Sequence, residues 1–409
     1  MQIRYFDEPY RFIAPFRGKR WCRALRPFYW RIANLAGLYK IEVRGRELLA
    51  KSLQDRAGVI LAPNHAAVAD MPLLSKVGLE VDRYLYFLAS YHVFKQSRLK
   101  AFLLHRVGGY SVLREGVDRE SLRESVKLLG EGDRPLVIFP EGTWRRQCER
   151  VTTFQQGAGL ILRQAAKKAE RPIVLHPVAI RFWHLDDPRP EFDRRLAKLE
   201  RMLRWRPELG GPFVGRLLRI NAALTAIKES QTFGRPQQGR LDDRIRGLME
   251  TLIAAEEERQ PGRRRPLDAL DRIRALRPEL VRRLVEEPAS REDARGRLDD
   301  LLDAELLWGQ EQNYLLESPT WERFGESLQR TEEDLFDTDV PLGPMGGVAV
   351  VGPALAASEH PETRNGDDPI LATAREWIQK TLVEITAEGP PKAWACPPRT
   401  MLEAPDELP

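Results

Sequence analysis

The stretch Gly58-Val-Ile-Leu-Ala-Pro-Asn-His-Ala-Ala-Val-Ala-Asp70 decides how the rest of the chain is interpreted. Its apolar beginning, Gly58 to Leu61, is typical of a buried strand. Asp70 with Pro72 predicts the start of a helix, because aspartate is a preferred cap residue and proline is tolerated in the first turn. The sequence therefore predicts a strand, a loop and a helix, with His65 in the loop.

His65 and Asp70 are spaced so that they meet only across a turn. On a continuous helix, five residues would rotate one side chain about 140° away from the other. Across a turn, the carboxylate of Asp70 can hold one imidazole nitrogen, and the other nitrogen can take a proton from a hydroxyl. The alternative is that Asp70 only caps the helix and His65 only fills the turn.

A second segment, Arg106-Val-Gly-Gly-Tyr-Ser-Val-Leu-Arg114, predicts a strand after a glycine turn, with a cation at its end. A guanidinium there can bind a phosphate through two parallel hydrogen bonds. Taken alone, Arg114 also fits a surface ion pair with Glu115.

A third segment, Pro135-Leu-Val-Ile-Phe-Pro-Glu-Gly-Thr143, predicts a buried strand that Pro140 ends. Glu141, Gly142 and Thr143 then lie in the loop at its carboxyl end, where open α/β sheets bind ligands. Taken alone, Glu141 also fits ordinary turn chemistry.

A further strand, Pro172-Ile-Val-Leu-His-Pro-Val-Ala-Ile180, completes a set of four blocks in order across residues 57 to 180. The set resembles the glycerolipid acyltransferase family, whose blocks are Asn-His-x4-Asp, Gly-x-Phe/Tyr-x-x-x-Arg, Phe-Pro-Glu-Gly-Thr/Ser and a Pro-Val-containing strand. The resemblance is strongest to the bacterial 1-acylglycerol-3-phosphate acyltransferases. It implies an α/β fold with a mostly parallel central sheet flanked by helices.

The resemblance also implies roles for these residues. His65 is expected to be the general base, and Asp70 to fix its tautomer and stabilise the imidazolium. The acceptor hydroxyl would then attack the thioester directly, without an acyl-enzyme. The residues expected to bind the substrate are Asn64, Arg114, Glu141, Gly142 and Thr143.

One departure from the family concerns the residues after the third block. Where many members carry Phe-Lys-Lys-Gly-Ala, this chain has Phe154-Gln155-Gln156-Gly-Ala158. The missing cations leave the identity of the acceptor open. Arg145 and Arg146 either supply the charge or are solvated.

Composition indicates a peripheral enzyme. The 409 residues are 42% hydrophobic, which is enough for a sizeable core. Three distant cysteines, Cys22, Cys148 and Cys396, suggest neither a disulfide framework nor a metal site. No apolar run reaches the length of a membrane span. We expect a peripheral membrane protein on the cytoplasmic face that needs no cofactor beyond acyl-CoA or acyl-carrier protein as co-substrate.

The first 40 residues interleave aromatic and apolar side chains with cations, which indicates an amphipathic arm at a membrane surface. The residues concerned are Phe12, Phe16, Trp21, Phe28, Tyr29, Trp30 and Leu35 with Arg11, Arg17, Lys19, Arg20, Arg23, Arg26 and Arg31. An ordinary helix packed on the sheet, or nucleic-acid binding, are the alternatives. Because the net charge is only +5 and the chain has no recognisable nucleic-acid-binding motif, no nucleic-acid partner is expected.

The remaining chain divides into segments that differ in their pattern of apolar and polar residues. Residues 41–187 alternate strand and helix signals and form the predicted α/β domain. Residues 188–340 have apolar stripes at helical spacing and are interpreted as a helical insertion. Residues 341–388 carry a strand and a helix that return to the α/β domain, and the tail at 389–409 is expected to be disordered.

The sequence thus predicts transfer of a fatty acyl group to the sn-2 hydroxyl of 1-acylglycerol 3-phosphate in phospholipid biosynthesis. The alternatives are another acceptor, such as glycerol 3-phosphate or a different lysophospholipid, and a catalytically silent membrane-binding scaffold. The acyl chain, the choice of acyl carrier and the oligomeric state are left open.

Overall fold

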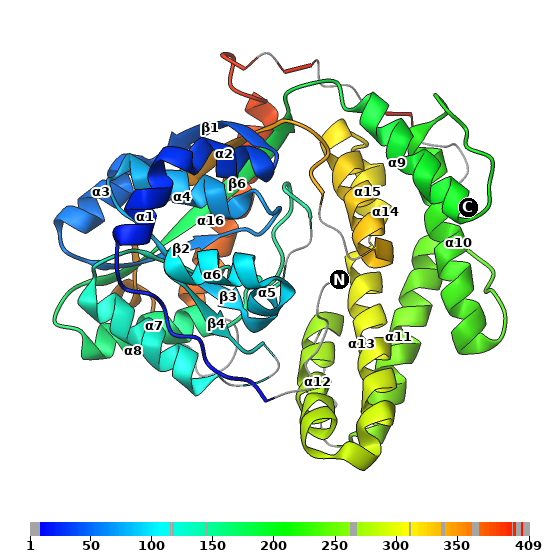
Figure 1. The fold of residues 1–409 in the computed structure, drawn as a ribbon, viewed down its shortest axis with the longest axis horizontal. Coiled ribbons are helices and arrows are strands. Elements are labelled where there is room, and N and C mark those ends of the chain that lie inside the picture. The colour runs from blue at the N-terminus through cyan, green and yellow to red at the C-terminus, as the bar shows by residue number, and fades with distance from the viewer. Residues whose placement is uncertain are drawn as a thin grey trace. The chain divides into compact units, whose positions relative to one another are not determined.

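The computed structural model describes residues 9–114, 116, 118–143, 146–261, 268–310, 312–336, 340–361, 368–394, 396–397 and 402–403. The chain divides into two compact units (Figure 1). We call residues 11–186 and 343–397 the sheet unit. Residues 187–342, together with 1–10 and 398–409, form the helical unit.

Among the described residues, eight strands form one sheet in the sheet unit. Its order is β1-β7-β6-β2-β5-β3-β4, and β8 pairs with β6. The strands are β1 (Leu38–Arg44), β2 (Gly58–Pro63), β3 (Tyr86–Ser90), β4 (Gly109–Val112), β5 (Leu136–Val137), β6 (Ile173–His184), β7 (Met345–Val351) and β8 (Leu355–Ala356). All neighbours are parallel except β6 with β7 and β6 with β8. The predicted mostly parallel sheet is confirmed.

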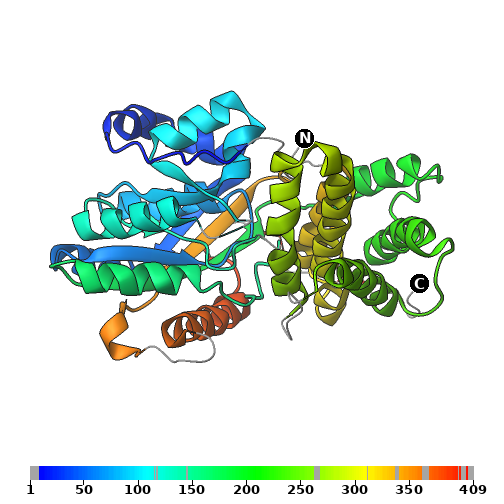
Figure 2. The same cartoon turned by 90° about the horizontal axis from the view of Figure 1, so that it is seen from below.

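Helices cover both faces of this sheet, because β2 and β6 are apolar on both sides. Val59 and Leu61 of β2 face one core, and Ile60 and Ala62 face the other. The first core is shared with α2 (Tyr29–Leu35), α3 (Arg46–Gln54) and α4 (Asp70–Glu80), and the second with α7 (Arg119–Glu131), α8 (Gly157–Lys168) and α16 (Pro369–Glu388). In Figure 2 the red helix α16 and the blue N-terminal helices lie on opposite sides of the strands.

The N-terminal segment packs against β4 before its helices begin. The N–H of Ile13 donates to Oγ of Ser111, and the N–H of Ser111 donates to the carbonyl of Ile13. Next come α1 (Arg20–Leu25), the 3-10 turn η1 (Arg26–Phe28) and α2. These helices nevertheless expose large apolar side chains: Trp21, Phe28, Trp30, Ile32 and Leu35.

Two further helices, α5 (Tyr91–Gln96) and α6 (Arg98–Arg106), connect β3 to β4. Phe102 of α6 meets Trp21 of α1 edge to face, with ring centroids 5.2 Å apart. Leu99 and Phe102 are exposed, so α6 adds to the apolar surface of the N-terminal helices.

The helical unit has its own core, formed by one apolar stripe from each helix. Its helices are α9 (Arg189–Met202), α10 (Phe213–Phe233), α11 (Leu241–Arg259), α12 (Ala269–Glu286), α13 (Arg291–Gly309), α14 (Gln312–Glu317) and α15 (Trp321–Phe336), with the 3-10 turn η2 (Pro288–Ser290). Arginines that reach this core are ion-paired: Arg216 is bound by Glu200 and Asp193. Within the described part of the chain, no helix combines the length and apolarity that crossing a membrane requires.

Part of the carboxyl-terminal tail makes defined contacts. The Trp394 ring lies edge to face against Trp183, with centroids 6.3 Å apart, and packs over Gly346 of β7. The N–H of Leu402 donates to the carbonyl of Pro319. The disorder expected after Gly389 stays a prediction, and within that tail Trp394 and Leu402 make these contacts.

Candidate active site

The His65 imidazole and the Asp70 carboxylate meet across the turn between β2 and α4. Nδ1 of His65 lies 2.7 Å from Oδ2 of Asp70. The same oxygen accepts the backbone N–H groups of Ala66 and Ala67, at 2.8 and 3.1 Å. The Asp70 side chain is 1% exposed and that of His65 is 25% exposed. A buried carboxylate thus fixes the orientation of a solvent-accessible imidazole and directs Nε2 away from itself.

Phe139 stacks on the His65 ring. The ring centroids lie 3.9 Å apart and the planes are 24° from parallel. Phe139 immediately precedes Pro140, at the end of the short segment that follows β5. The sequence does not predict this contact, because Phe139 stands in the third block without any signal that pairs it with His65.

Glu141 binds the backbone of the loop that carries His65. Oε1 accepts the N–H of His65 at 2.8 Å, and Oε2 accepts the N–H and the hydroxyl of Thr152, at 3.2 and 2.7 Å. Burial raises the pKa of the Glu141 carboxyl, although these hydrogen bonds oppose the shift. Glu141 thus joins the His65 loop to the segment before α8.

Arg114 and Gly142 come from different blocks and meet at the same edge of the sheet. Nη1 of Arg114 donates to the carbonyl of Gly142 at 3.2 Å, and the Arg114 side chain is exposed. Gly142 has a φ of +69°, a conformation that favours glycine. The glycine lets the loop turn so that its carbonyl faces Arg114. The structure therefore brings Arg114, Glu141 and Gly142 close to His65 and Asp70.

Asn64 and Thr143 behave differently from the other candidates. The Asn64 side chain is 1% exposed and makes two bonds to Ile180 of β6: Nδ2 donates to the carbonyl at 3.0 Å, and Oδ1 accepts the N–H at 2.7 Å. Its amide ties the end of β2 to β6, and its predicted role in substrate binding stays a prediction. Thr143 follows Gly142 and is partly exposed.

The residues after the third block are also placed. Arg146 is buried, with a φ of +54°, so it is not the solvated residue that the sequence allowed; Arg145 lies outside the described residues. The N–H of Gln155 donates to the carbonyl of Pro140, and Oε1 of Gln156 accepts the N–H of Asp368. Gln156 thus connects the start of α8 to the residue that precedes α16.

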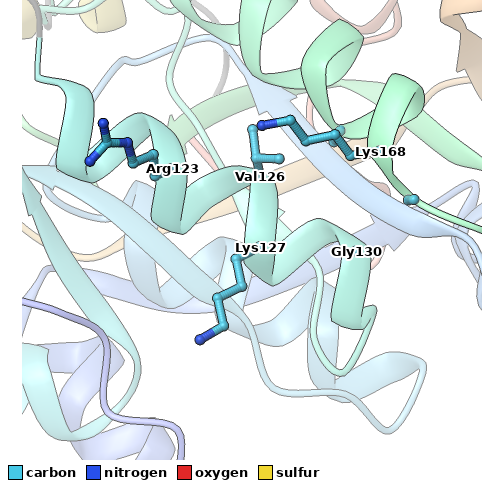
Figure 3. A pocket seen from close by; sticks show the side chains of 7 residues that line it. Arg123, Val126, Lys127, Gly130 and Lys168 are labelled. Carbon is cyan, nitrogen blue, oxygen red and sulfur yellow. The ribbon is translucent and has the colours of Figure 1, made fainter.

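A hollow of about 300 Å³ lies apart from these residues, between α7 and α8 (Figure 3). Its lining is Arg123, Val126, Lys127, Gly130, Ala165, Lys168 and Ala169. In Figure 3 the Lys168 side chain reaches from α8 across to Val126, whereas Lys127 extends the other way. No residue of the predicted site lines this hollow.

Three comparisons with known proteins bear on the identity of the chain. Residues 40–181 match the family model described as Acyltransferase. A comparison with curated protein sequences gave no match. Among solved structures, one match is to the 1-acyl-sn-glycerophosphate (LPA) acyltransferase PlsC from Thermotoga maritima, at 25% identity and a TM-score of 0.28. That match covers 39% of this chain and only 56% of the Thermotoga chain, and a superposition of this quality does not bear on substrate or mechanism.

The matched segment runs from the start of β1 to the middle of β6. It contains His65, Asp70, Arg114, Glu141 and Gly142, whose contacts are described above. Residues 40–181 thus match an acyltransferase domain, and this matched segment carries the candidate site.

Proposed function

We propose that the protein transfers a fatty acyl group from acyl-CoA or acyl-carrier protein to the sn-2 hydroxyl of 1-acylglycerol 3-phosphate, in phospholipid biosynthesis. The observation that carries this proposal is the His65–Asp70 pair at 2.7 Å, held in a loop that Glu141 also anchors. A silent scaffold has no need for a buried carboxylate that orients an accessible imidazole.

The proposed reaction is a single displacement. Nε2 of His65 takes the proton of the acceptor hydroxyl as its oxygen attacks the thioester carbonyl. The carbon–sulfur bond then breaks, and the leaving thiolate takes the proton from His65. The Asp70 side chain stays hydrogen-bonded to Nδ1 and stabilises the imidazolium between these two transfers.

Arg114 is proposed to bind the acceptor phosphate. Its exposed guanidinium already donates to the Gly142 carbonyl, so it is oriented along the edge of the site. The remaining N–H groups suit a phosphate, whose oxygens accept two parallel hydrogen bonds.

We also propose that the enzyme acts peripherally, at the cytoplasmic face of a membrane. The exposed apolar side chains of α1, α2 and α6 support this, together with the cations between them. The hydroxyl of Tyr29 in α2 donates to the carbonyl of Pro72 at 2.8 Å, which connects this surface to the start of α4, where Asp70 lies. A lipid acceptor would therefore meet the protein beside the proposed site.

The experiment is an assay of the purified protein against a panel of lysolipids, with acyl-CoA and acyl-carrier protein as alternative donors. We expect transfer to 1-acylglycerol 3-phosphate and weaker transfer to lysolipids without a free phosphate. Preference for glycerol 3-phosphate or a larger head group would change the acceptor but not the reaction. Absence of transfer with every pair would overturn the proposal.

A further inference from the structure

The loop that follows α9 presents apolar side chains and cations to solvent. We call residues 201–209 the Trp205 loop; it comprises the last two residues of α9 and the chain that leads from α9 toward α10 (Figure 1). Met202, Trp205 and Leu209 are 41%, 39% and 69% exposed. Arg204 and Arg206 lie between them, Arg201 directly precedes Met202, and all three arginines are exposed as well. An indole next to arginines is a combination suited to the interface between water and lipid.

The start of this loop has a defined geometry. The N–H of Arg204 donates to the carbonyl of Arg201 at 3.0 Å, and the N–H of Trp205 donates to the carbonyl of Glu200 at 2.8 Å. These are the two bonds of a Schellman motif, which closes a helix and usually places glycine in the left-handed position. Here that position is Arg204, with a φ of +62°. The chain thus keeps a cation where a glycine would be less strained.

The end of the loop is fixed by two carboxylates, the buried Glu200 and the partly exposed Asp193. Glu200 is bound by Arg216, and its Oε2 accepts the N–H of Glu208 at 3.4 Å. Both oxygens of Asp193 accept the N–H of Gly210, at 3.1 and 3.2 Å. The loop is therefore held at both ends, and a partner would not have to order it.

The arginines of the loop differ from several other exposed arginines of the helical unit. Arg194, Arg246 and Arg282 are exposed and ion-paired with acids of their own helices or turns. For Arg201, Arg204 and Arg206 the described residues provide no ion pair. The only acid of the loop, Glu208, is bound by Arg219. The loop therefore carries uncompensated positive charge.

We propose that the Trp205 loop is a contact site for an anionic lipid surface. The three arginines face the lipid phosphates, and Met202, Trp205 and Leu209 enter the headgroup region. This inference adds a lipid contact in the helical unit to the one proposed for α1, α2 and α6. Its test measures binding without turnover, so its failure and failure of the proposed acyl transfer are distinguishable.

The test is cosedimentation of the full chain with phosphatidylcholine vesicles, with and without phosphatidylglycerol. The test variant carries three substitutions, Arg201→Gln, Arg204→Gly and Arg206→Gln. Glycine is chosen at position 204 because that residue has the left-handed conformation. We expect the partition of this variant onto phosphatidylglycerol vesicles at low salt to fall on the order of a hundredfold. Trp205→Ala should weaken the binding that remains at high salt, because apolar burial is not screened.

The matched control is Arg194→Gln, Arg246→Gln and Arg282→Gln, which removes the same charge from ion-paired surface arginines of the same unit. Circular dichroism and thermal unfolding establish that all variants are folded. Unchanged vesicle binding by the loop variant, or an equal loss in the control, would overturn the proposal. The proposal would also be overturned if vesicle binding were unchanged and light scattering showed that the loop variant separates copies of the chain. The loop would then be a contact between copies.

Discussion

Nδ1 of His65 lies 2.7 Å from Oδ2 of Asp70, and that oxygen also accepts two backbone N–H groups of the same turn. One carboxylate thus shapes the loop and orients the ring. A carboxylate that accepts from Nδ1–H leaves Nε2 as the basic nitrogen. This relationship predicts that loss of either side chain lowers turnover.

His65→Ala is expected to lower kcat by about a hundred to ten-thousandfold, the usual contribution of a general base. Asp70→Asn should also lower it, because an amide oxygen in the place of Oδ2 can keep these hydrogen bonds but brings no negative charge to stabilise the imidazolium. Steady-state acyl transfer measures both, with circular dichroism as the control for folding. Normal turnover by a folded His65→Ala protein would rule out the mechanism.

Phe139 is expected to position His65 through the stacking contact at 3.9 Å. Removal of the ring in Phe139→Leu should lower kcat roughly tenfold, because the imidazole loses its support and the imidazolium loses a cation–π contact. Phe139→Tyr keeps a ring and should retain most of the activity. The KM of the acceptor should change little in either variant. A rise in KM at constant kcat would show instead that Phe139 contacts substrate.

Arg114→Lys separates acceptor binding from catalysis. Lysine keeps the charge but not the planar fork, so the KM for a phosphate-bearing acceptor should rise about tenfold, while that for the acyl donor stays the same. Arg119→Lys, at the exposed first turn of α7, is the matched control. Equal weakening with an acceptor that lacks a phosphate would give Arg114 a different role.

Glu141 gives a prediction that depends on pH. Burial raises the pKa of its carboxyl above the ordinary value of 4.5, so the folded protein holds this proton more tightly than the unfolded chain. As pH rises from about 4.5 through the raised pKa, the unfolded chain ionises first, and wild type should lose stability relative to Glu141→Gln. Urea unfolding of both proteins across this range measures the difference. If the stability of wild type relative to Glu141→Gln did not change with pH over this range, the carboxyl would ionise in the folded protein at no cost.

The same substitution tests the role of Glu141 in the loop. The amide of Glu141→Gln has a single acceptor oxygen, so the donors of His65 and Thr152 cannot both be satisfied. One unsatisfied buried donor costs about 1–3 kcal/mol. Activity at neutral pH should therefore fall together with the order of the His65 loop.

Local signals explain which parts of the site the sequence predicted. The turn that joins His65 to Asp70 depends on neighbouring residues, and so does the cap of α7, where Asp118 accepts the N–H of Ser121. The bond from Asn64 to Ile180 spans 116 residues and depends on which strands become neighbours. No pattern along the chain specifies that choice of neighbour.

The N-terminal segment shows the same limit on prediction. Its cations suggested an arm facing lipid, but Arg17 is ion-paired with Glu124 and Glu131, and Lys19 with Asp133. These acids belong to α7 and the turn after it, more than 100 residues away. The periodicity of the arm could not distinguish these cations from those that remain exposed.

The membrane prediction therefore rests on three exposed cations, Arg20, Arg23 and Arg31. They are close in sequence to the exposed Trp21, Trp30 and Leu35. Each cation near anionic lipid contributes about 1 kcal/mol and is screened by salt. The variant with all three changed to Glu should be released from anionic vesicles at low salt. Trp21→Ala with Trp30→Ala should weaken the part of binding that resists salt.

A matched control changes Arg123, Lys127 and Lys168, exposed cations of α7 and α8, to Glu. This control has the same net charge as the arm variant, so it corrects for the general effect of charge on vesicle binding. Activity on a soluble short-chain acceptor should survive in every variant, because none of these residues belongs to the proposed site. Equal release of the arm and control variants would mean that net charge alone holds the protein on the membrane. Unchanged binding of the arm variant would mean that α1 and α2 have a structural role only.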